Sequence, residues 1–523
     1  MIAGAGPQCG KNEEESALSY RSRKLLPAPC SPLPAPDDES ALSYRFRKGV
    51  TYRLVEGSPT LILNYPLKVV RLDPALGSVF EGLASRGPFS LKAFLDQVGI
   101  ENSIKTERFL DGLVRKGFLE RSGAATITSF PFISVIIPVR NRAEMISECL
   151  RSLEALDYPR DRLEIIVVDD ASQDHTPAVV AAFPVKLISL SERRQASFCR
   201  NRAAAQALGD LLAFIDSDCL ADPLWLRQLT PSFQDPAVAA VGGMVEAYLG
   251  PGGLDRYEMV KSSLKVSSWY RRSGPDDRFF YVPSCNLLVR KELFLEVGGF
   301  REDLHVGEDV DLCWRLQGCG GEVEYIPSGK VHHKHRNRLG AFCVRRFQYG
   351  TSEPMLQKLH PERSKTFLVP PLSFLFWAVT ALSFALGFPP LAAAGPGILF
   401  VQSLHKFWKI RKNKIPLGFG VVCLAVVRSS LSFFYQCCAF VSRYYLLCPF
   451  LLLPLFPFLS LFLFGMHLLT VTVEYLTHKP RLSPLEFALY FTLDQMSYQG
   501  GVWWGCIRQS NFRALFPAIK SHL

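Results

Sequence analysis

The chain has 523 residues, too many for one ordinary hydrophobic core, so its length predicts several domains. Hydrophobic residues make up 48% and charged residues 20%, values that are typical of a folded protein. A net charge of +11 suits an anionic partner, such as a membrane surface or a nucleotide phosphate, and no motif predicts a nucleic acid partner. Neither the number nor the spacing of the 14 cysteines suggests a disulfide scaffold or a zinc ribbon, which favours buried thiols in a reducing compartment.

The first 48 residues are rich in proline, serine and charge, and we predict that they are disordered. The heptapeptide ESALSYR occurs twice, at 15–21 and 39–45, but one short repeat does not indicate a solenoid. The N-terminus carries no apolar run of the signal-peptide type, so we expect the catalytic region to stay in the cytoplasm.

Residues 50–122 predict a small separate α/β domain. Short strand-like runs at 52–56, 60–64 and 68–72 precede three helices, which begin near Asp73, near Ser90 and at about residue 105. This order, with the ending LVRKGFL at 113–119, resembles the small winged-helix-like peptide-chaperone domains of peptide-derived cofactor pathways. A generic packing domain explains the same pattern.

The region 132–335 alternates strand and helix signals. Apolar runs rich in β-formers lie at 132–139, 163–170, 185–190 and 211–216, with helical patterns such as 143–156 and 176–182 between them. Such alternation predicts a parallel α/β sheet, whose ligands bind at the carboxyl ends of the strands.

Polar motifs follow several of these strands. The first two motifs are IIPVRN at 136–141 and VVDDASQD at 167–174. A carboxylate just beyond a buried strand, as in the second motif, can accept hydrogen bonds from a uracil ring or a ribose. Acids also often cap strands and helices without binding a ligand. The next motif is ASFCRNRA at 196–203, where Arg200 can approach a diphosphate or pair with an acid.

The motif LAFIDSD at 212–218 places two acids around Ser217 at a strand end. Mg²⁺ and Mn²⁺ are often held by one or two carboxylates plus substrate phosphates, and the cation would neutralise a departing nucleoside diphosphate. Asp-x-Asp in isolation is common, but here it follows two other strand-end motifs in the order expected of one site, which strengthens the assignment to a cation.

The last motifs are YVPSCNLLVR at 281–290, VGGF at 297–300 and GEDVDLCWRL at 307–316. Asp309 falls at the start of a predicted amphipathic helix, whose macrodipole would keep the carboxylate ionised and able to remove a proton from an acceptor hydroxyl. Simple N-capping is the alternative. The run VHHKH at 331–335 is either a solvated basic turn or a source of a metal-binding histidine, His333.

As an ordered set, these motifs resemble the family-2 glycosyltransferases of GT-A fold, which are Rossmann-like nucleotide-sugar enzymes. The resemblance implies Asp170 at the nucleoside, Asp218 on a divalent cation (Mn²⁺ or Mg²⁺) and Asp309 as the base of an inverting displacement. It assigns nucleotide-sugar binding to Pro138, Arg140, Asn141, Asp169, Asp170, Arg200, Asp216 and Ser217. It assigns the acceptor side to Ser284, Cys285, Asn286 and Glu308, and the metal to Asp216, Asp218 and His333. Processive members carry Gln-x-x-Arg-Trp after the base, whereas residues 345–350 read RRFQYG, which argues against such a mechanism.

The last third of the chain is hydrophobic. Residues 367–386 and 446–464 are about long enough to cross a bilayer, and a basic cluster lies between them at 406–414. The run 417–447 is apolar but contains Arg428 and Arg443, which indicates an amphipathic or interfacial helix. We predict association with the cell membrane through one to three spans, and a soluble helical bundle is the alternative.

The expected organisation is a disordered segment (1–48), a peptide-chaperone-like domain (50–122), a catalytic domain (130–360) and a membrane-associated helical region (365–523). This arrangement, with LDQMSYQGGVWWGC at 493–506, resembles the mycofactocin-system glycosyltransferases. The resemblance implies transfer of glucose from UDP-glucose to a peptide-derived redox cofactor. Two alternatives remain: a membrane glycosyltransferase with a lipid or polysaccharide acceptor, and a non-enzymatic peptide-binding membrane protein.

Overall fold

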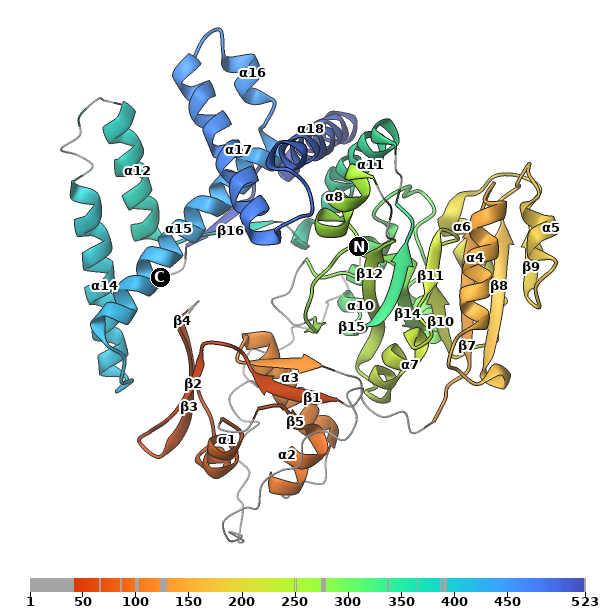
Figure 1. Cartoon of the computed structure of the whole chain (residues 1–523), viewed down its shortest axis with the longest axis horizontal. Coiled ribbons are helices and arrows are strands. Elements are labelled where there is room, and N and C mark those ends of the chain that lie inside the picture. Colours follow the sequence, from red (N-terminus) through yellow and green to blue (C-terminus); the bar gives the residue numbers. More distant parts are fainter. Residues whose placement is uncertain are drawn as a thin grey trace, which may run out of the picture.

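The computed structural model describes residues 42–64, 67–84, 87–98, 103–122, 129–248, 250, 252–273, 279–335, 338–363, 365–385, 388 and 393–521. These residues form a small N-terminal α/β region, a larger α/β region and a group of C-terminal helices (Figure 1).

The N-terminal region contains the expected three strands and three helices, to within a few residues. An antiparallel sheet comprises β2 (Val50–Val55), β3 (Ser58–Asn64) and β4 (Leu67–Arg71). It is followed by η1 (Pro74–Leu76), α1 (Gly77–Ala84), α2 (Leu91–Val98) and α3 (Ser103–Lys116). Phe80, Phe94 and Leu110 are buried in one core shared by sheet and helices.

A second small sheet corrects the predicted extent of disorder. Residues 1–41 lie outside the described residues, but β1 (Ser43–Phe46) pairs with β5 (Phe89–Ser90) and β6 (Leu119–Ser122). The prediction of disorder as far as residue 48 is therefore wrong. Tyr44 is fully buried and donates a 3.1 Å hydrogen bond to Asp111, a partner far along the chain that local composition does not reveal.

The larger region begins with the predicted strand–helix alternation. Its first elements are β7 (Ile133–Val139), α4 (Ala143–Glu154), η2 (Arg160–Arg162), β8 (Leu163–Asp169), α5 (Thr176–Val180), β9 (Lys186–Ser189), α6 (Gln195–Ala204) and β10 (Leu211–Phe214). The strands β9, β8, β7 and β10 are parallel neighbours. Ile133, Val135 and Ile137 face one core and Ile136 faces another, which explains why β7 is apolar throughout.

The complete sheet is mixed, so the prediction of a parallel sheet holds for its first half and is wrong for the rest. Its order is β11-β15-β12-β14-β10-β7-β8-β9, with β13 paired to β15, and β14 runs antiparallel to β10. The later elements are β11 (Cys219–Ala221), α7 (Trp225–Leu229), η3 (Thr230–Gln234), β12 (Val238–Ala247), α8 (Gly253–Lys261), β13 (Arg271–Arg272), η4 (Ser284–Asn286), β14 (Leu287–Arg290), α9 (Lys291–Glu296), α10 (Glu308–Gly318), β15 (Glu322–His333) and α11 (Leu339–Leu359).

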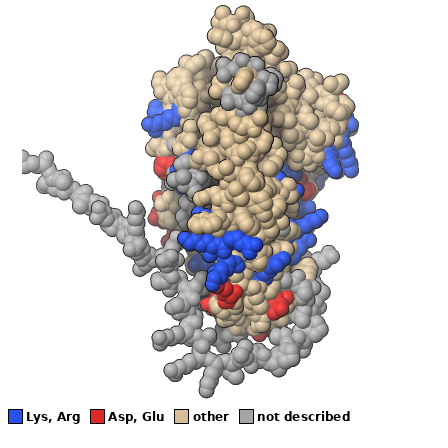
Figure 2. Space-filling model, turned by 90° about the vertical axis from the view of Figure 1, so that its left-hand side faces the viewer, with Lys and Arg blue, Asp and Glu red and all other residues tan. Residues whose placement is uncertain are grey.

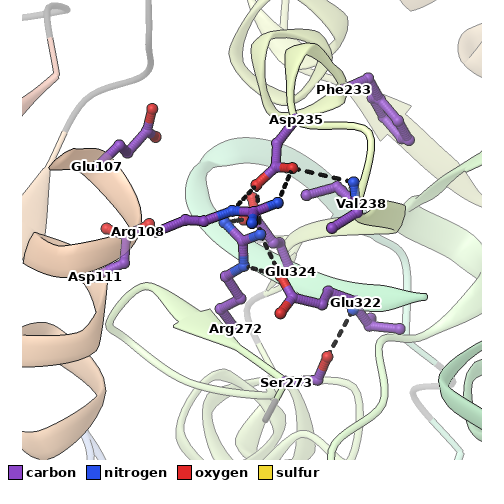
Figure 3. A network of polar contacts seen from close by, with 12 residues as sticks. Glu107, Arg108, Asp111, Phe233, Asp235, Val238, Arg272, Ser273, Glu322 and Glu324 are labelled. Carbon is purple, nitrogen blue, oxygen red and sulfur yellow. Dashed lines mark hydrogen bonds and ion pairs between the residues drawn. The ribbon is translucent and has the colours of Figure 1, made fainter. Parts of the chain in front are cut away.

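A network of charged residues joins the N-terminal region to this sheet (Figure 3). Arg108 of α3 pairs with Asp235 at 2.5 Å, and Asp235 also lies 2.6 Å from the Arg272 guanidinium. Arg272 further contacts Glu322 and Glu324, the latter almost fully buried. Because buried charges are stable only when paired, this network fixes α3 against the edge of the sheet.

The C-terminal region consists mainly of helices. They are α12 (Pro371–Ala385), α14 (Ala394–Lys412), α15 (Phe419–Tyr444), α16 (Cys448–Leu452), α17 (Pro457–His478) and α18 (Pro484–Gln509). The strands β16 (Thr366–Val369) and β17 (Ala518–Ser521) pair in parallel, and η5 (Pro361–Arg363) and η6 (Arg513–Leu515) complete the region.

Two helices, α15 and α17, are long and apolar enough to cross a membrane, judged by length and composition. They differ from the predicted spans. Residues 366–369 form a strand rather than part of a span, and residues 446–464 are split between α16 and α17 where Pro454 and Pro457 interrupt the helix. Figure 2 shows a broad face without charged residues, with a band of Lys and Arg below it.

The helix α18 packs tightly on α11 and so joins the C-terminal region to the larger α/β region. Three glycines make the approach possible: a Cβ on Gly350 would lie 2.1 Å from the Tyr498 carbonyl oxygen, and one on Gly501 would lie 1.9 Å from the Phe347 carbonyl oxygen. Gly505 similarly approaches Thr351. Of the glycines in the sequence QGGVWWG, Gly501 and Gly505 therefore have a packing role.

Candidate active site

A cleft of about 300 Å³ opens where β7, β8 and β10 end. It brings together most of the predicted site residues, although they are spread over nearly 200 positions of sequence: Pro138, Arg140, Asp170, Arg200, Asp216, Ser217, Asp218, Ser284, Cys285, Glu308, Asp309 and His333. Three predicted residues do not line it: Asn141, Asp169 and Asn286.

The two acids that follow β8 differ in role. Asp170 accepts hydrogen bonds from the backbone N–H groups of Arg194 (2.5 Å) and Gln195 (3.0 Å), and thereby fixes the start of α6 beside the cleft. Asp169 lies behind it, nearly buried, and accepts a 3.3 Å bond from the Ser172 N–H. Of the two, Asp170 is the one that lines the cleft.

The side chains of Asn141 and Asn286 have structural partners. Asn141 accepts a hydrogen bond from the Gln173 N–H (2.8 Å) and joins the loops after β7 and β8. Asn286 is fully buried, accepts from the Trp225 indole (2.7 Å) and donates to the Gly329 carbonyl (3.0 Å). Asn286 therefore packs inside the protein and does not contact the acceptor as predicted. A sequence motif cannot distinguish a buried asparagine from one that faces a ligand.

The Asp-x-Asp motif lies beside a histidine at the end of β15. Antiparallel pairing of β11 with β15 aligns Cys219 with His333, and His333 Nε2 lies 3.5 Å from Asp218 Oδ1. Asp218, Cys219 and His333 form a group that can hold a metal ion. Burial raises the pKa of the Cys219 thiol, so it stays protonated, and the donor set suited to a hard cation is Asp218 with His333.

Arg200 connects the metal motif to the helix that carries the predicted base. It is nearly fully buried and pairs with Asp216 at 2.6 Å and with Glu308 at 3.1 Å. Burial alone would lower the pKa of Arg200, but these two carboxylates hold it above its ordinary value. Of the two roles predicted for Arg200, the structure shows the pairing with acids, and Asp216 is directed towards Arg200.

Asp309 is the second residue of α10. Gly307, with φ of 85°, turns the chain directly into this helix, a conformation that favours glycine. Asp309 accepts hydrogen bonds from the N–H groups of Val310 (2.8 Å) and Ser284 (3.3 Å). Burial, followed by the charge of Glu308, nevertheless raises the pKa of Asp309 to about 7. The expected helix-dipole effect is thus outweighed by desolvation, which gives a carboxylate suited to accept a proton near neutral pH.

The cleft also contains residues that the motifs did not reveal. Arg345 and Tyr349 of α11 line it, with the Arg345 guanidinium 4.7 Å from the Tyr349 ring centroid. His305 and Arg142 complete the wall. Arg345 and Tyr349 are one helical turn apart in RRFQYG, and this spacing is the signal that could have placed them on a shared face.

Comparison with known proteins gives a consistent result. The family model "Glycosyl transferase family 2" matches residues 134–298. Glycosyltransferase AglE of Haloferax volcanii is 32% identical over 233 residues, 43% of this chain and 74% of that protein. This chain belongs to the family-2 glycosyltransferases. The enzyme has the GT-A-like α/β fold that its motifs predicted.

A longer match extends beyond the catalytic region of this glycosyltransferase. The pre-mycofactocin glycosyltransferase of Mycobacterium tuberculosis is 28% identical over 404 residues, which cover 74% of this chain and 82% of that protein. Among solved structures, the mannosyltransferase PcManGT from Pyrobaculum calidifontis, in complex with GDP-Man and Mn²⁺, has a TM-score of 0.37 and 20% identity. The match covers 59% of this chain and 89% of the mannosyltransferase chain.

Proposed function

We propose that this glycosyltransferase moves glucose from UDP-glucose onto a mycofactocin precursor, with inversion at the anomeric carbon. The acceptor assignment is supported by the extent of the match to the pre-mycofactocin glycosyltransferase, which includes residues outside the catalytic region. The observation that carries the mechanism is Asp309, a buried carboxyl with a pKa of about 7 in the wall of the cleft.

In this mechanism the acceptor hydroxyl attacks the anomeric carbon of the donor. Asp309 takes the hydroxyl proton, the new glycosidic bond forms, and the bond from the sugar to the nucleoside diphosphate breaks as that diphosphate leaves. Asp170 lies at the nucleoside end. Arg140 lines the cleft, and its Nη1 is buried without a hydrogen-bond partner among the described residues, so this guanidinium suits a phosphate oxygen.

A divalent cation fits the pair Asp218 and His333. When bound it neutralises charge on the departing diphosphate. We further propose that the enzyme associates with the cell membrane through the apolar helices α15 and α17, with the catalytic region on the cytoplasmic side. Phe458, Leu461 and Phe462 of α17 are more than half exposed, and a lipid environment would cover them.

The small N-terminal domain is proposed to bind the peptide-derived acceptor. The support is its strand and helix order, which matches the expected peptide-chaperone pattern, and its fixed attachment to the catalytic sheet through Arg108 and Arg272.

A lipid acceptor is the second candidate. The glucosyl-dolichyl phosphate glucuronosyltransferase of Haloferax volcanii is 29% identical over 247 residues, and the exposed apolar helices would suit such an acceptor.

The test is UDP release by the purified enzyme with UDP-glucose, Mn²⁺ and pre-mycofactocin. We expect release that needs the acceptor, stops when EDTA removes the cation, and falls at least a hundredfold in Asp218→Asn. Release with a dolichyl phosphate acceptor but none with pre-mycofactocin would favour the second candidate. Undiminished UDP release in the presence of EDTA would contradict the proposed requirement for a divalent cation.

A further inference from the structure

The C-terminal region contains a long stretch of chain with basic residues but no acidic ones. No aspartate or glutamate lies between Glu362 and Glu474, whereas five lysines and arginines fall within residues 406–414 alone. These five residues lie at the end of α14 and in the turn that follows it. So dense a positive charge, without acids nearby in the sequence, attracts an anionic partner.

Most of these cations have no acidic partner within the protein. Lys414 pairs with Glu56, which lies in the turn between β2 and β3. Lys409, Arg411 and Lys412 are exposed, and no carboxylate among the described residues lies within ion-pair distance of them. The dipole of α14 supplies only about half a negative charge at this end of the helix, so most of the positive charge is uncompensated.

The basic end of α14 adjoins an apolar face. Phe400 and Leu404 of this helix are exposed, and so are Phe374, Leu375 and Leu382 of α12. Figure 2 looks at the side of the molecule on which these two helices lie, and shows an uncharged face directly above a band of Lys and Arg. Apolar surface borders positive charge in this way where a membrane protein passes from the acyl chains to the headgroups.

One side of α14 shows the order of this transition. Phe400, Leu404, Trp408 and Lys412 are spaced by four residues, so their side chains follow one another along the helix. Trp408 is 64% exposed, and the Lys412 ammonium lies 5.5 Å from the centroid of its ring. From Leu404 to Lys412 the helix rises by about 12 Å. Apolar side chains, then an indole, then a cation is the order that suits the acyl chains, the interface and the phosphates of one lipid leaflet.

The N-terminal domain contacts the same turn. Besides the pair between Lys414 and Glu56, Arg71 of β4 donates a hydrogen bond to the Asn413 carbonyl oxygen. The Arg71 guanidinium also lies 3.7 Å from the Glu56 carboxylate. A lipid surface that binds the end of α14 would therefore hold the N-terminal domain close to the membrane.

We propose that Lys409, Arg411 and Lys412, together with Trp408, bind the phosphate groups of anionic phospholipids such as phosphatidylglycerol. This inference rests on the proposed membrane association through α15 and α17, and adds to it a contact with the headgroups. The contact fixes the depth of α14 in the leaflet and brings the N-terminal domain to the membrane surface. It does not depend on which sugar or acceptor the enzyme uses.

The test measures the lipid preference of the full-length enzyme by electron spin resonance in reconstituted phosphatidylcholine bilayers. The probes are trace amounts of phosphatidylglycerol or phosphatidylcholine that carry the same spin-labelled acyl chain. Lipids in contact with the protein give a motionally restricted signal, from which the relative association constant follows. We expect the wild type to prefer phosphatidylglycerol at least about threefold, because the unpaired cations attract its negative headgroup.

Neutralising the three cations should remove this preference. In the triple variant Lys409→Gln/Arg411→Gln/Lys412→Gln we expect the two lipids to associate about equally, and UDP binding shows that each variant is folded. The preference should persist in a control variant that loses three exposed cations of the larger α/β region: Arg151→Gln/Arg202→Gln/Lys358→Gln.

Salt provides a measurement that needs no variant. Raising NaCl from about 0.1 M to about 1 M should weaken the preference of the wild type, because the Debye length falls from about 10 Å to about 3 Å. Equal association of the two lipids in the wild type, or a preference that survives in the triple variant or is unaffected by salt, would overturn the headgroup contact.

Two results separate this inference from the proposed function. A restricted signal from neither lipid would show that the enzyme does not enter the bilayer, and would overturn the membrane association and the headgroup contact together. Glucose transfer is measured on the same samples. Its absence, with the lipid preference present, would contradict the proposed reaction and support the headgroup contact.

Discussion

Replacing Gly501 with alanine should loosen the contact between α11 and α18. A Cβ at this position would lie 1.9 Å from the Phe347 carbonyl oxygen and 3.1 Å from the Gly350 Cα. Both are backbone atoms of α11, which no side-chain rotation can move. The two helices would have to separate, and the cavity of about 710 Å³ that both helices line would change shape.

The neighbouring Gly500 provides a matched control. A Cβ there would meet the Phe347 ring at 3.6 Å, an ordinary van der Waals distance. Both glycines lie inside α18, so alanine gains about 1 kcal/mol of helix propensity in each variant and this gain cancels between them. The difference between the variants is then the steric cost, about 1–3 kcal/mol for overpacking.

The measurement is thermal unfolding of the two variants in the same detergent. We expect Gly501→Ala to unfold several degrees below Gly500→Ala, and Gly500→Ala to unfold at or above the wild-type temperature. Equal unfolding temperatures for the two variants would refute the backbone contact between α11 and α18.

Two further predictions concern buried charges. Asp309→Asn should abolish transfer, while wild-type activity should fall as pH drops below about 7, because the base must be ionised. Burial raises the pKa of Asp309 in the folded state, so ionisation of this carboxyl destabilises the folded protein from about pH 4 upward. Asp309→Asn should therefore unfold at a higher temperature than the wild type at pH 8, but not at pH 4. The opposite order of unfolding temperatures would contradict the effect of burial on Asp309. Arg272→Gln should cost about 3–5 kcal/mol, because it removes the guanidinium that pairs with the buried Glu324 (Figure 3) and leaves this carboxylate with a neutral partner, the hydroxyl of Tyr270. Faster proteolysis at the N-terminal region would report the loss. The exposed pair Arg301–Asp303 gives the control, and an equal effect of Arg301→Gln would contradict the argument.

The sequence predicted the parts of the fold that depend on local pattern. The strands β7, β8 and β10 could be predicted because apolar runs end in polar motifs, and the carboxyl ends of parallel strands gather those motifs in one cleft. The antiparallel strand β14 could not be predicted, since its direction depends on pairing with β10 and not on its own residues.

Within the site, the sequence predicted most of the polar residues that line the cleft but not their partners. The proximity of His333 to Asp218 depends on the register of β11 and β15, and Asn286 has a packing role because of a contact with Trp225. The raised pKa of Asp309 depends on burial, which the sequence does not reveal. The cavity of about 710 Å³ lined by α11 and α18 arises where the C-terminal helices meet the catalytic region, and no local motif marks that junction.

The proposed mechanism depends most on Asp309 as the base that takes the acceptor proton during sugar transfer. The most direct measurement is the transfer of radiolabelled glucose from UDP-glucose to pre-mycofactocin by wild type, Asp309→Asn and the exposed control Asp303→Asn. We expect a labelled product with inverted anomeric configuration from the wild type and the control, and none from Asp309→Asn. Product formation by Asp309→Asn at the wild-type rate, or retention of configuration in the product, would contradict it.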